Sequence, residues 1–256
     1  MIPLKEQDAI RLKFAQELIG PVKIDYFTEG DTALSVPGKT PCAYCKPTGE
    51  MLQELANLND LVSLRVHLMD EAKDERSKYG IERVPATVLR GLNGQFVKYY
   101  GIPSGTEFPA LVESIVDISR KEVLLSPDSQ KTLKSLEKDV SIRVFVTPTC
   151  GYCPQMVHLV YQMALASDKI HAEVIEITEF SDLAEKYKVQ AVPLTVINDA
   201  VAIPGAVPEP QLIEQIIEAS ASTIAPPSTL PAGDSTPTPP PEVKRGEQRS
   251  SGLYIP

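Results

Sequence analysis

The chain has 256 residues, 43% of them hydrophobic, with four cysteines and a formal net charge of −9. This length suits two domains of ordinary size, and the cysteine content is far below that of a small secreted scaffold built on disulfides. Sequence-independent binding to nucleic acid requires a basic surface, so we expect no nucleic-acid partner for this acidic chain.

The N-terminal segment, MIPLKEQDAIRLKFAQELIG, predicts an amphipathic helix. Charged residues interrupt it throughout, so it lacks the continuous apolar core of a signal peptide. Elsewhere the chain shows no run of about 20 apolar residues, which is the length that crosses a bilayer. We therefore expect a cytoplasmic protein with no membrane partner.

An internal duplication organises most of the chain. Cys42 precedes Pro85 by 43 residues, and Cys150 precedes Pro193 by the same 43. Around the two prolines, YGIERVPATVL matches YKVQAVPLTVI at an offset of 108 residues. Because cysteine pairs and proline segments both match at a fixed spacing, the sequence predicts two homologous domains.

We place the first domain at residues 1–120 and the second at residues 121–222. Beyond them, residues 223–256 are rich in proline and almost free of periodic apolar residues. Such a segment buries too little apolar surface to offset the entropy lost on ordering, so we expect a disordered tail. Its acidic and basic residues cancel, which leaves the negative excess on the two domains.

Each domain shows the same order of predicted elements. A strand comes first (22–27 and 141–146), because β-branched and aromatic residues dominate these short runs. The cysteine pair follows and opens a helix, with a proline near the start, where its missing N–H costs little. The remaining elements are a second strand (61–69 and 171–178), a charged surface helix (70–80 and 179–189), two short strands after Val-Pro, joined in the second domain by an Asn-Asp turn, and a closing helix (105–120 and 208–221).

The element order β-α-β-α-β-β-α predicts an α/β fold, with a central mixed β-sheet flanked by helices in each domain. It places a CxxC pair at the first strand-to-helix junction. The first domain has ten extra residues before Cys42, within residues 28–40. We interpret them either as a tolerated surface insertion or as a lip that restricts access to Cys42.

The four cysteines, Cys42, Cys45, Cys150 and Cys153, form two CxxC pairs with three possible interpretations. A shared zinc site is one, yet 104 residues separate the pairs instead of the usual ~15–20. A structural disulfide within CxxC closes a very small loop, so it constrains the unfolded chain little. A redox pair explains more features. At a helix N-terminus the first sulfur meets the positive end of the helix dipole, which lowers its pKa, and the second cysteine lies one turn away to resolve a mixed disulfide.

A CxxC at a strand–helix junction, with Val-Pro about forty residues later, resembles the thioredoxin superfamily. CAYC and CGYC, in a chain without tryptophan, look more like glutaredoxin than like ordinary thioredoxin. Two such units in tandem, with FVTPTCGYC in the second and YGIPSGTEFPALVESIVDISR bridging them, closely resemble the archaeal-type protein disulfide oxidoreductases. That glutaredoxin-like family is found chiefly in thermophiles. The resemblance covers about residues 1–222.

The resemblance implies that Cys150 and Cys42 are nucleophiles and that Cys153 and Cys45 are the resolving thiols. It implies dithiol–disulfide oxidoreductase activity on protein substrates, as reductase, oxidase or isomerase. No bound cofactor is expected, and electrons would come from a thioredoxin-reductase-like flavoprotein. Two other functions stay open: a glutathione-dependent glutaredoxin, and a non-catalytic scaffold that has kept the fold.

The resemblance also identifies substrate-binding residues. Pro85 and Pro193 match the family's cis-proline, which faces the disulfide. The backbone of the preceding Val84 or Val192 is then free to pair with an extended substrate strand.

Two further features bear on the sites. Tyr44 and Tyr152, within the CxxC motifs, are expected either to shield the site or to pack in the protein. In the second unit, Val144 occupies the strand position of the buried acid that aids proton transfer in many thioredoxins. Since the longer loop makes the first site different, we expect Cys150 and Cys153 to be the more active pair.

Overall fold

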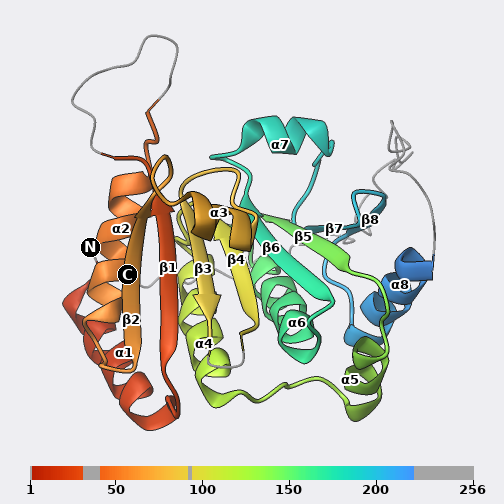
Figure 1. Ribbon diagram of the computed structural model, residues 1–256, viewed down its shortest axis with the longest axis horizontal. Coiled ribbons are helices and arrows are strands. Elements are labelled where there is room, and N and C mark those ends of the chain that lie inside the picture. Colours follow the sequence, from red (N-terminus) through yellow and green to blue (C-terminus); the bar gives the residue numbers. More distant parts are fainter. Residues whose placement is uncertain (1, 31–40, 92–93, 222–256) are drawn as a thin grey trace, which may run out of the picture.

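The computed structural model describes residues 2–30, 41–91 and 94–221. Within these ranges the chain forms eight helices and eight strands, and all the strands belong to one sheet with the order β2-β1-β3-β4-β6-β5-β7-β8 (Figure 1). The tail expected at residues 223–256, and most of the loop expected at residues 28–40, lie outside the described residues.

The two units follow the predicted order, with element ends within a few residues of the expected ranges. The first unit contains α1 (Leu4–Glu17), β1 (Val22–Thr28), α2 (Cys45–Ala56), β2 (Val62–Leu68), α3 (Lys73–Tyr79), β3 (Ala86–Arg90), β4 (Phe96–Tyr100) and α4 (Glu107–Arg120). The second contains α5 (Pro127–Lys134), β5 (Val140–Val146), α6 (Cys153–Ala166), β6 (Ile170–Glu176), α7 (Ser181–Lys186), β7 (Leu194–Ile197), β8 (Val201–Pro204) and α8 (Glu209–Ala221).

Helix α5 is the one element in the described residues that the sequence patterns do not predict. Its start is local: Ser126 Oγ accepts a hydrogen bond from Ser129 N at 3.2 Å, and Pro127 takes the first helical position. The helix has eight residues and buries one large apolar side chain, Leu133. A single large apolar residue gives no apolar periodicity from which the helix could be recognised.

The turn between β7 and β8 confirms the expected hairpin in the second unit. Asn198 and Asp199 have φ angles of 51° and 57°, and Ala200 N donates to Ile197 O at 3.0 Å. Two central residues with positive φ define a type I′ turn, which asparagine and aspartate tolerate well. Leu-Asn-Gly in the first unit also predicts a hairpin turn, and residues 92–93 of that turn lie outside the described residues.

Strands β4 and β6 join the two units edge to edge. They pair in parallel, with Lys98 opposite Glu173 and Tyr100 opposite Ile175. Lys98 Nζ also forms an ion pair with Glu173 Oε1 at 2.7 Å, and the two side chains are only 7% and 15% exposed. From α6, the Tyr161 hydroxyl donates to the Lys98 carbonyl at 2.8 Å. Two four-stranded sheets thereby become one, which the sequence did not predict.

The directions of the strands place the starts of α2 and α6 at the same end of the sheet, where β1 and β5 have their carboxyl ends. Strand β1 is antiparallel to β3 and β3 to β4, whereas β4, β6 and β5 are parallel. Strands β1 and β5 therefore point the same way, and both cysteine pairs follow their carboxyl ends.

Two apolar cores cover the two faces of the sheet, and each contains residues of both units. The larger core lies under α1, α2, α4, α5, α6 and α8, and its fully buried members include Phe14, Leu52, Ile115, Leu133, Val160 and Ile216. The smaller core lies under α3 and α7 and includes Phe27, Tyr79, Phe145 and Tyr187. No helix within the described residues is long and apolar enough to span a membrane.

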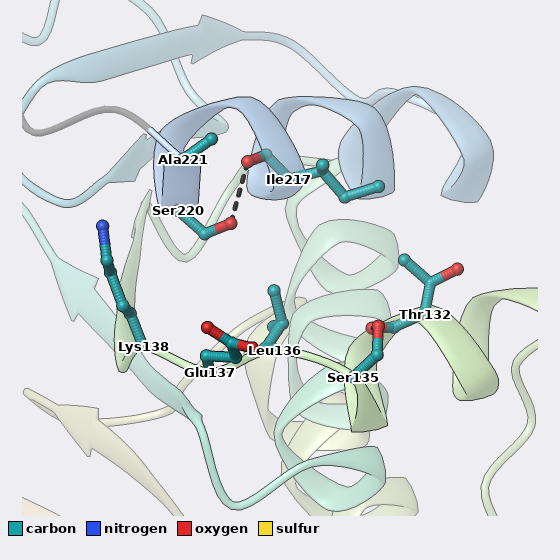
Figure 2. Close-up of a pocket in the computed structure, with 8 residues that line it drawn as sticks. All are labelled: Thr132, Ser135, Leu136, Glu137, Lys138, Ile217, Ser220 and Ala221. Atoms are coloured by element: carbon teal, nitrogen blue, oxygen red, sulfur yellow. Dashed lines mark hydrogen bonds between the residues drawn. The ribbon is translucent and has the colours of Figure 1, made fainter.

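A cavity of about 400 Å³ lies between the end of α5 and the end of α8 (Figure 2). Its lining residues are Thr132, Ser135, Leu136, Glu137, Lys138, Ile217, Ser220 and Ala221. Across it, Figure 2 shows α8 with Ser220 Oγ donating to Ile217 O at 2.8 Å. None of these residues belongs to a CxxC or Val-Pro motif, so the cavity is separate from the sites predicted from the sequence.

The connection between β4 and α4, residues 101–106, crosses to the second unit and is called the crossing segment below. Thr106 N donates to Pro148 O at 2.9 Å, and Ile102 N donates to Glu179 Oε1 at 2.6 Å. Gly105 has φ +59°, and a Cβ added there would lie 2.2 Å from Pro148 O. Only glycine fits this approach, so the first unit presses directly against the loop that precedes Cys150.

Gly105→Ala is expected to destabilise the protein by about 2–5 kcal/mol, from the positive φ and the backbone clash together. Gly205→Ala is the matched control, since Gly205 has φ +76° but no heavy atom within 4 Å of an added Cβ. Its cost is about 1–2 kcal/mol for the backbone conformation alone. Free energies of unfolding from urea titrations measure both. Equal losses would show that the crossing segment does not press on Pro148.

Candidate functional site

The first cysteine pair lies where the chain enters α2. Cys45 is the first residue of this helix and is 6% exposed, whereas Cys42 lies before the helix and is only partly buried. A disulfide joins the two sulfurs. The Tyr26 hydroxyl of β1 donates to the Cys45 carbonyl at 2.5 Å, which ties the start of α2 to the central sheet.

The second pair has the same position in its own unit. Cys153 is the first residue of α6 and is completely buried, and a disulfide joins it to the partly exposed Cys150. Cys153 N donates to Cys150 Sγ at 3.1 Å. A backbone donor and the positive end of the helix dipole both stabilise a thiolate on this sulfur once the disulfide is reduced.

Each cysteine pair is bonded internally, so the chain has two separate dithiol–disulfide sites instead of one cluster of four sulfurs. The histidines lie elsewhere, beside carboxylates. His67 Nε2 is 2.8 Å from Asp25 Oδ1, His158 Nδ1 is 3.2 Å from Asp117 Oδ2, and His171 Nε2 is 3.4 Å from Asp139 Oδ1. The interpretation of a shared zinc site gains no support from this arrangement.

A cis-proline lies at the sheet edge beside each cysteine pair. The Val84–Pro85 and Val192–Pro193 peptide bonds are both cis. Phe27 of β1 pairs with Ala86, and Phe145 of β5 pairs with Leu194, so each proline lies opposite the end of the strand that leads to its CxxC.

The valines before the two prolines have free backbone groups. Among the described residues, neither Val84 nor Val192 forms a backbone hydrogen bond, and both are partly exposed. An unpaired backbone beside a disulfide is the arrangement needed to bind an extended peptide.

The two tyrosines of the CxxC motifs lie on the surface. Tyr44 is 45% exposed and Tyr152 is 71% exposed. Their rings are therefore not packed in a core, which favours the expectation that they shield or contact the site.

Neither unit has an acid at the strand position where many thioredoxins have one. Val144 of β5 is completely buried, and the matching residue of β1 is Tyr26. Burial raises the pKa of Tyr26 to about 12, so this hydroxyl does not exchange protons readily near neutral pH.

A buried acid follows the crossing segment instead. The Thr106 hydroxyl donates to the carbonyls of Pro148 and Cys150 at 3.1 and 3.0 Å, and Glu107 follows as the first residue of α4. Glu107 is 1% exposed, and neither of its carboxylate oxygens has a hydrogen-bond partner in the described residues. Burial, with a smaller effect of the Glu176 carboxylate, raises the pKa of Glu107 to about 7. No local pattern links Glu107 with Cys150, because the two lie in different units.

Comparisons with known proteins agree with this division into two units. A family model described as a thioredoxin domain matches residues 33–113 and residues 140–218. Each matched range contains one CxxC pair and one cis-proline.

Two solved structures resemble the whole two-unit arrangement. A protein disulfide oxidoreductase from Aeropyrum pernix is 29% identical with a TM-score of 0.75, covering 85% of this chain and 93% of that chain. A mutant of the alkylhydroperoxide reductase AhpF from Enterococcus faecalis is 26% identical with a TM-score of 0.74, covering 84% of this chain and 99% of that chain.

Curated relatives are longer than this chain. The alkyl hydroperoxide reductase AhpF of Pseudomonas putida is 24% identical over 152 residues, which are 59% of this chain and 27% of that protein. An NADH dehydrogenase of Ferdinandcohnia aciditolerans is 25% identical over 175 residues, 66% of this chain and 34% of that protein. The chain thus spans about a quarter to a third of these relatives.

Glu107 is expected to make the folded state less stable as the pH rises from about 4.5 to about 7. Its pKa is about 7 in the folded protein against an ordinary value of 4.5, so the folded state holds this proton more tightly than the unfolded chain. The free energy of unfolding therefore falls across this window, by roughly 3 kcal/mol in total.

Glu107→Gln removes this dependence. The variant should match the wild type at pH 4.5 and exceed its free energy of unfolding by roughly 2–3 kcal/mol at pH 8. Urea titrations at both pH values measure the difference. Glu113→Gln, on the exposed side of α4, is the control and should change stability by less than about 1 kcal/mol at either pH. Parallel pH profiles for wild type and Glu107→Gln would contradict the burial of an ionisable carboxyl.

Proposed function

Because this chain belongs to the thioredoxin-domain family, we propose that it is a protein dithiol–disulfide oxidoreductase. The observation that carries the proposal is a pair of CxxC disulfides, each at the start of a helix and at the same sheet edge as a cis-proline. A similar two-unit structure is named as a protein disulfide oxidoreductase. A non-catalytic scaffold needs neither the cysteines nor the unpaired backbone beside them, so this alternative is disfavoured.

Exchange at the second site proceeds by two displacements. The Cys150 thiolate attacks one sulfur of a substrate disulfide, forms a mixed disulfide and releases the other substrate sulfur as a thiolate. The Cys153 thiolate then attacks Cys150 Sγ and releases the second substrate thiolate. The substrate gains two electrons and the Cys150–Cys153 disulfide forms. Oxidation of a substrate dithiol follows the same steps in reverse.

Side-chain exposure supports these roles. Cys150 and Cys42 are partly exposed and can meet a substrate sulfur, whereas Cys153 and Cys45 are buried and can reach only their neighbour. The two cysteines at the helix starts therefore resolve, and the two before them attack.

Glu107 supplies the proton exchange that resolution at the second site requires. A buried thiol such as Cys153 must lose its proton before it attacks, and its side chain has no surface exposed to solvent. Glu107 is joined through Thr106 to the Cys150 backbone, and its pKa near 7 suits a group that both takes and gives a proton at neutral pH.

Substrates of this activity are proteins with accessible thiols or disulfides. The unpaired backbone of Val84 and Val192 supports pairing with an extended segment of substrate, which selects for unfolded or flexible chains. Tyr44 and Tyr152, exposed beside the disulfides, offer flat apolar rings to the same segment.

Electrons come from a separate thioredoxin-reductase-like flavoprotein in this proposal. Relatives named alkyl hydroperoxide reductase and NADH dehydrogenase match this chain over only part of their length, which supports a reductase partner. Use of glutathione is the nearer alternative and is tested by the same assay with glutathione as the reductant. A cytoplasmic location, a thermophilic source and the absence of a bound cofactor stay predictions from the sequence.

Insulin reduction by dithiothreitol tests the proposal. The wild type should accelerate the reaction, and Cys150→Ser/Cys153→Ser should lose most of the acceleration, since we expect the second pair to be the more active. Cys42→Ser/Cys45→Ser should keep most of it, and the four-serine variant should match the uncatalysed rate. The reverse order of the two double variants would show that the first site dominates. A wild type that does not accelerate the reaction would contradict the proposed activity.

A further inference from the structure

The residue that follows the first strand of each unit differs in charge. Glu29 comes directly after β1, and Thr147 comes directly after β5. In the second unit, Cys150 N donates to the backbone carbonyl of Thr147 at 3.2 Å. In the first unit, Cys42 N donates to Glu29 Oε2 at 3.1 Å. The amide of the attacking cysteine is thus bound by a neutral carbonyl in one site and by a carboxyl group in the other.

The attacking sulfurs of the two sites also differ in the hydrogen bonds that they accept. Cys150 Sγ accepts a hydrogen bond from Cys153 N at 3.1 Å. In the described part of the first unit, no N–H or O–H group donates to Cys42 Sγ. The second site therefore stabilises a thiolate by a direct donor that the first site lacks.

The carboxyl group of Glu29 acts against a thiolate on Cys42. Ionisation of Cys42 Sγ would add a second negative charge close to the Glu29 carboxylate. Repulsion between these two charges disfavours the thiolate and raises the pKa of the Cys42 thiol relative to a site with a neutral group at this position. The bond also joins the two ends of the longer connection before the first site, because residues 29 and 42 bracket it. Glu29 therefore places a carboxyl group at the Cys42 amide and ties Cys42 to the end of β1.

We propose that Glu29 is a positioning residue that makes the Cys42–Cys45 pair a stronger reductant than the Cys150–Cys153 pair. The inference rests on the proposed function and adds a direction to it. Stabilising a thiolate favours the reduced form of a cysteine pair and raises its reduction potential. The pair with the less stable thiolate therefore has the lower reduction potential. At equilibrium the second pair is then the stronger oxidant of substrate dithiols, and the first pair is the stronger reductant of substrate disulfides. The rate of insulin reduction instead depends on how much of the attacking cysteine is thiolate, which the second site stabilises.

Equilibration with glutathione tests this order. Cys150→Ser/Cys153→Ser leaves only the first site, and Cys42→Ser/Cys45→Ser leaves only the second. Each protein is equilibrated at pH 8 with mixtures of reduced and oxidised glutathione, quenched with acid, alkylated, and its reduced fraction measured by mass spectrometry. The equilibrium constant should favour the disulfide three- to tenfold more in the first site, a difference of about 15–30 mV.

Glu29→Gln, made in the first-site protein, separates charge from position. The amide oxygen of glutamine can still accept from Cys42 N, so only the charge is removed, and the three- to tenfold difference should largely disappear. Glu29→Ala removes the charge and the bond together. Glu50→Gln, an exposed carboxylate in the same helix as Cys45, is the control and should leave the equilibrium constant unchanged.

Three outcomes would overturn the inference. Equal constants in the two wild-type sites, or an unchanged constant in Glu29→Gln, would reject it even if exchange occurs. A change in Glu29→Ala alone would show a purely structural role. Thr147→Glu in the second-site protein provides an independent test if the Glu29 variants do not fold. This substitution should shift the equilibrium constant with glutathione about threefold towards the Cys150–Cys153 disulfide. Failure of both wild-type sites to exchange with glutathione and insulin would instead reject the proposed function.

Discussion

The parallel pairing of β4 with β6 is the interaction on which the rest of the protein depends. It joins two four-stranded sheets, and the buried ion pair between Lys98 and Glu173 lies at the start of this short ladder. Removing Glu173 would leave the buried Lys98 ammonium without its ion-pair partner, at a cost of about 3–5 kcal/mol, whereas the intact pair adds little net stability. Its contribution is therefore to the register, which places the carboxyl ends of β1 and β5 at one edge of the molecule.

The second site is built from both units as a result. Because β4 ends beside β6, the crossing segment passes under the loop before Cys150, where Gly105 and Thr106 contact its backbone. Glu107 then begins α4 as a buried carboxyl, although the strand position used in many thioredoxins holds Val144. The distinctive contact of the first site is the carboxyl group of Glu29 on Cys42. Duplication of one fold has thus produced two chemically different sites.

The sequence predicted those features that local patterns encode. Short β-branched runs, a proline near a helix start and the repeated Val-Pro were sufficient for the element order and both CxxC positions, whereas the two cis-prolines were expected only from the family resemblance. The joining of the sheets was not predictable, because Lys98 and Glu173 are distant in sequence and no short pattern marks their pairing. Glu107 was missed for the same reason, and Glu29 because no short pattern marks its pairing with Cys42, which lies 13 residues later. Helix α5 was missed because Leu133 is its only large apolar residue, which gives no periodicity.

Exchange at both CxxC pairs is tested most directly by trapping the mixed disulfides. Cys45→Ser/Cys153→Ser removes both resolving thiols and leaves Cys42 and Cys150 to attack. Reduced and folded, this variant is incubated with a peptide disulfide, and its intact mass is measured without reduction. Two peptides attached per chain, one at Cys42 and one at Cys150, is the predicted result. Attachment at neither cysteine, or only after denaturation, would show that these sulfurs are not accessible redox groups in the folded protein.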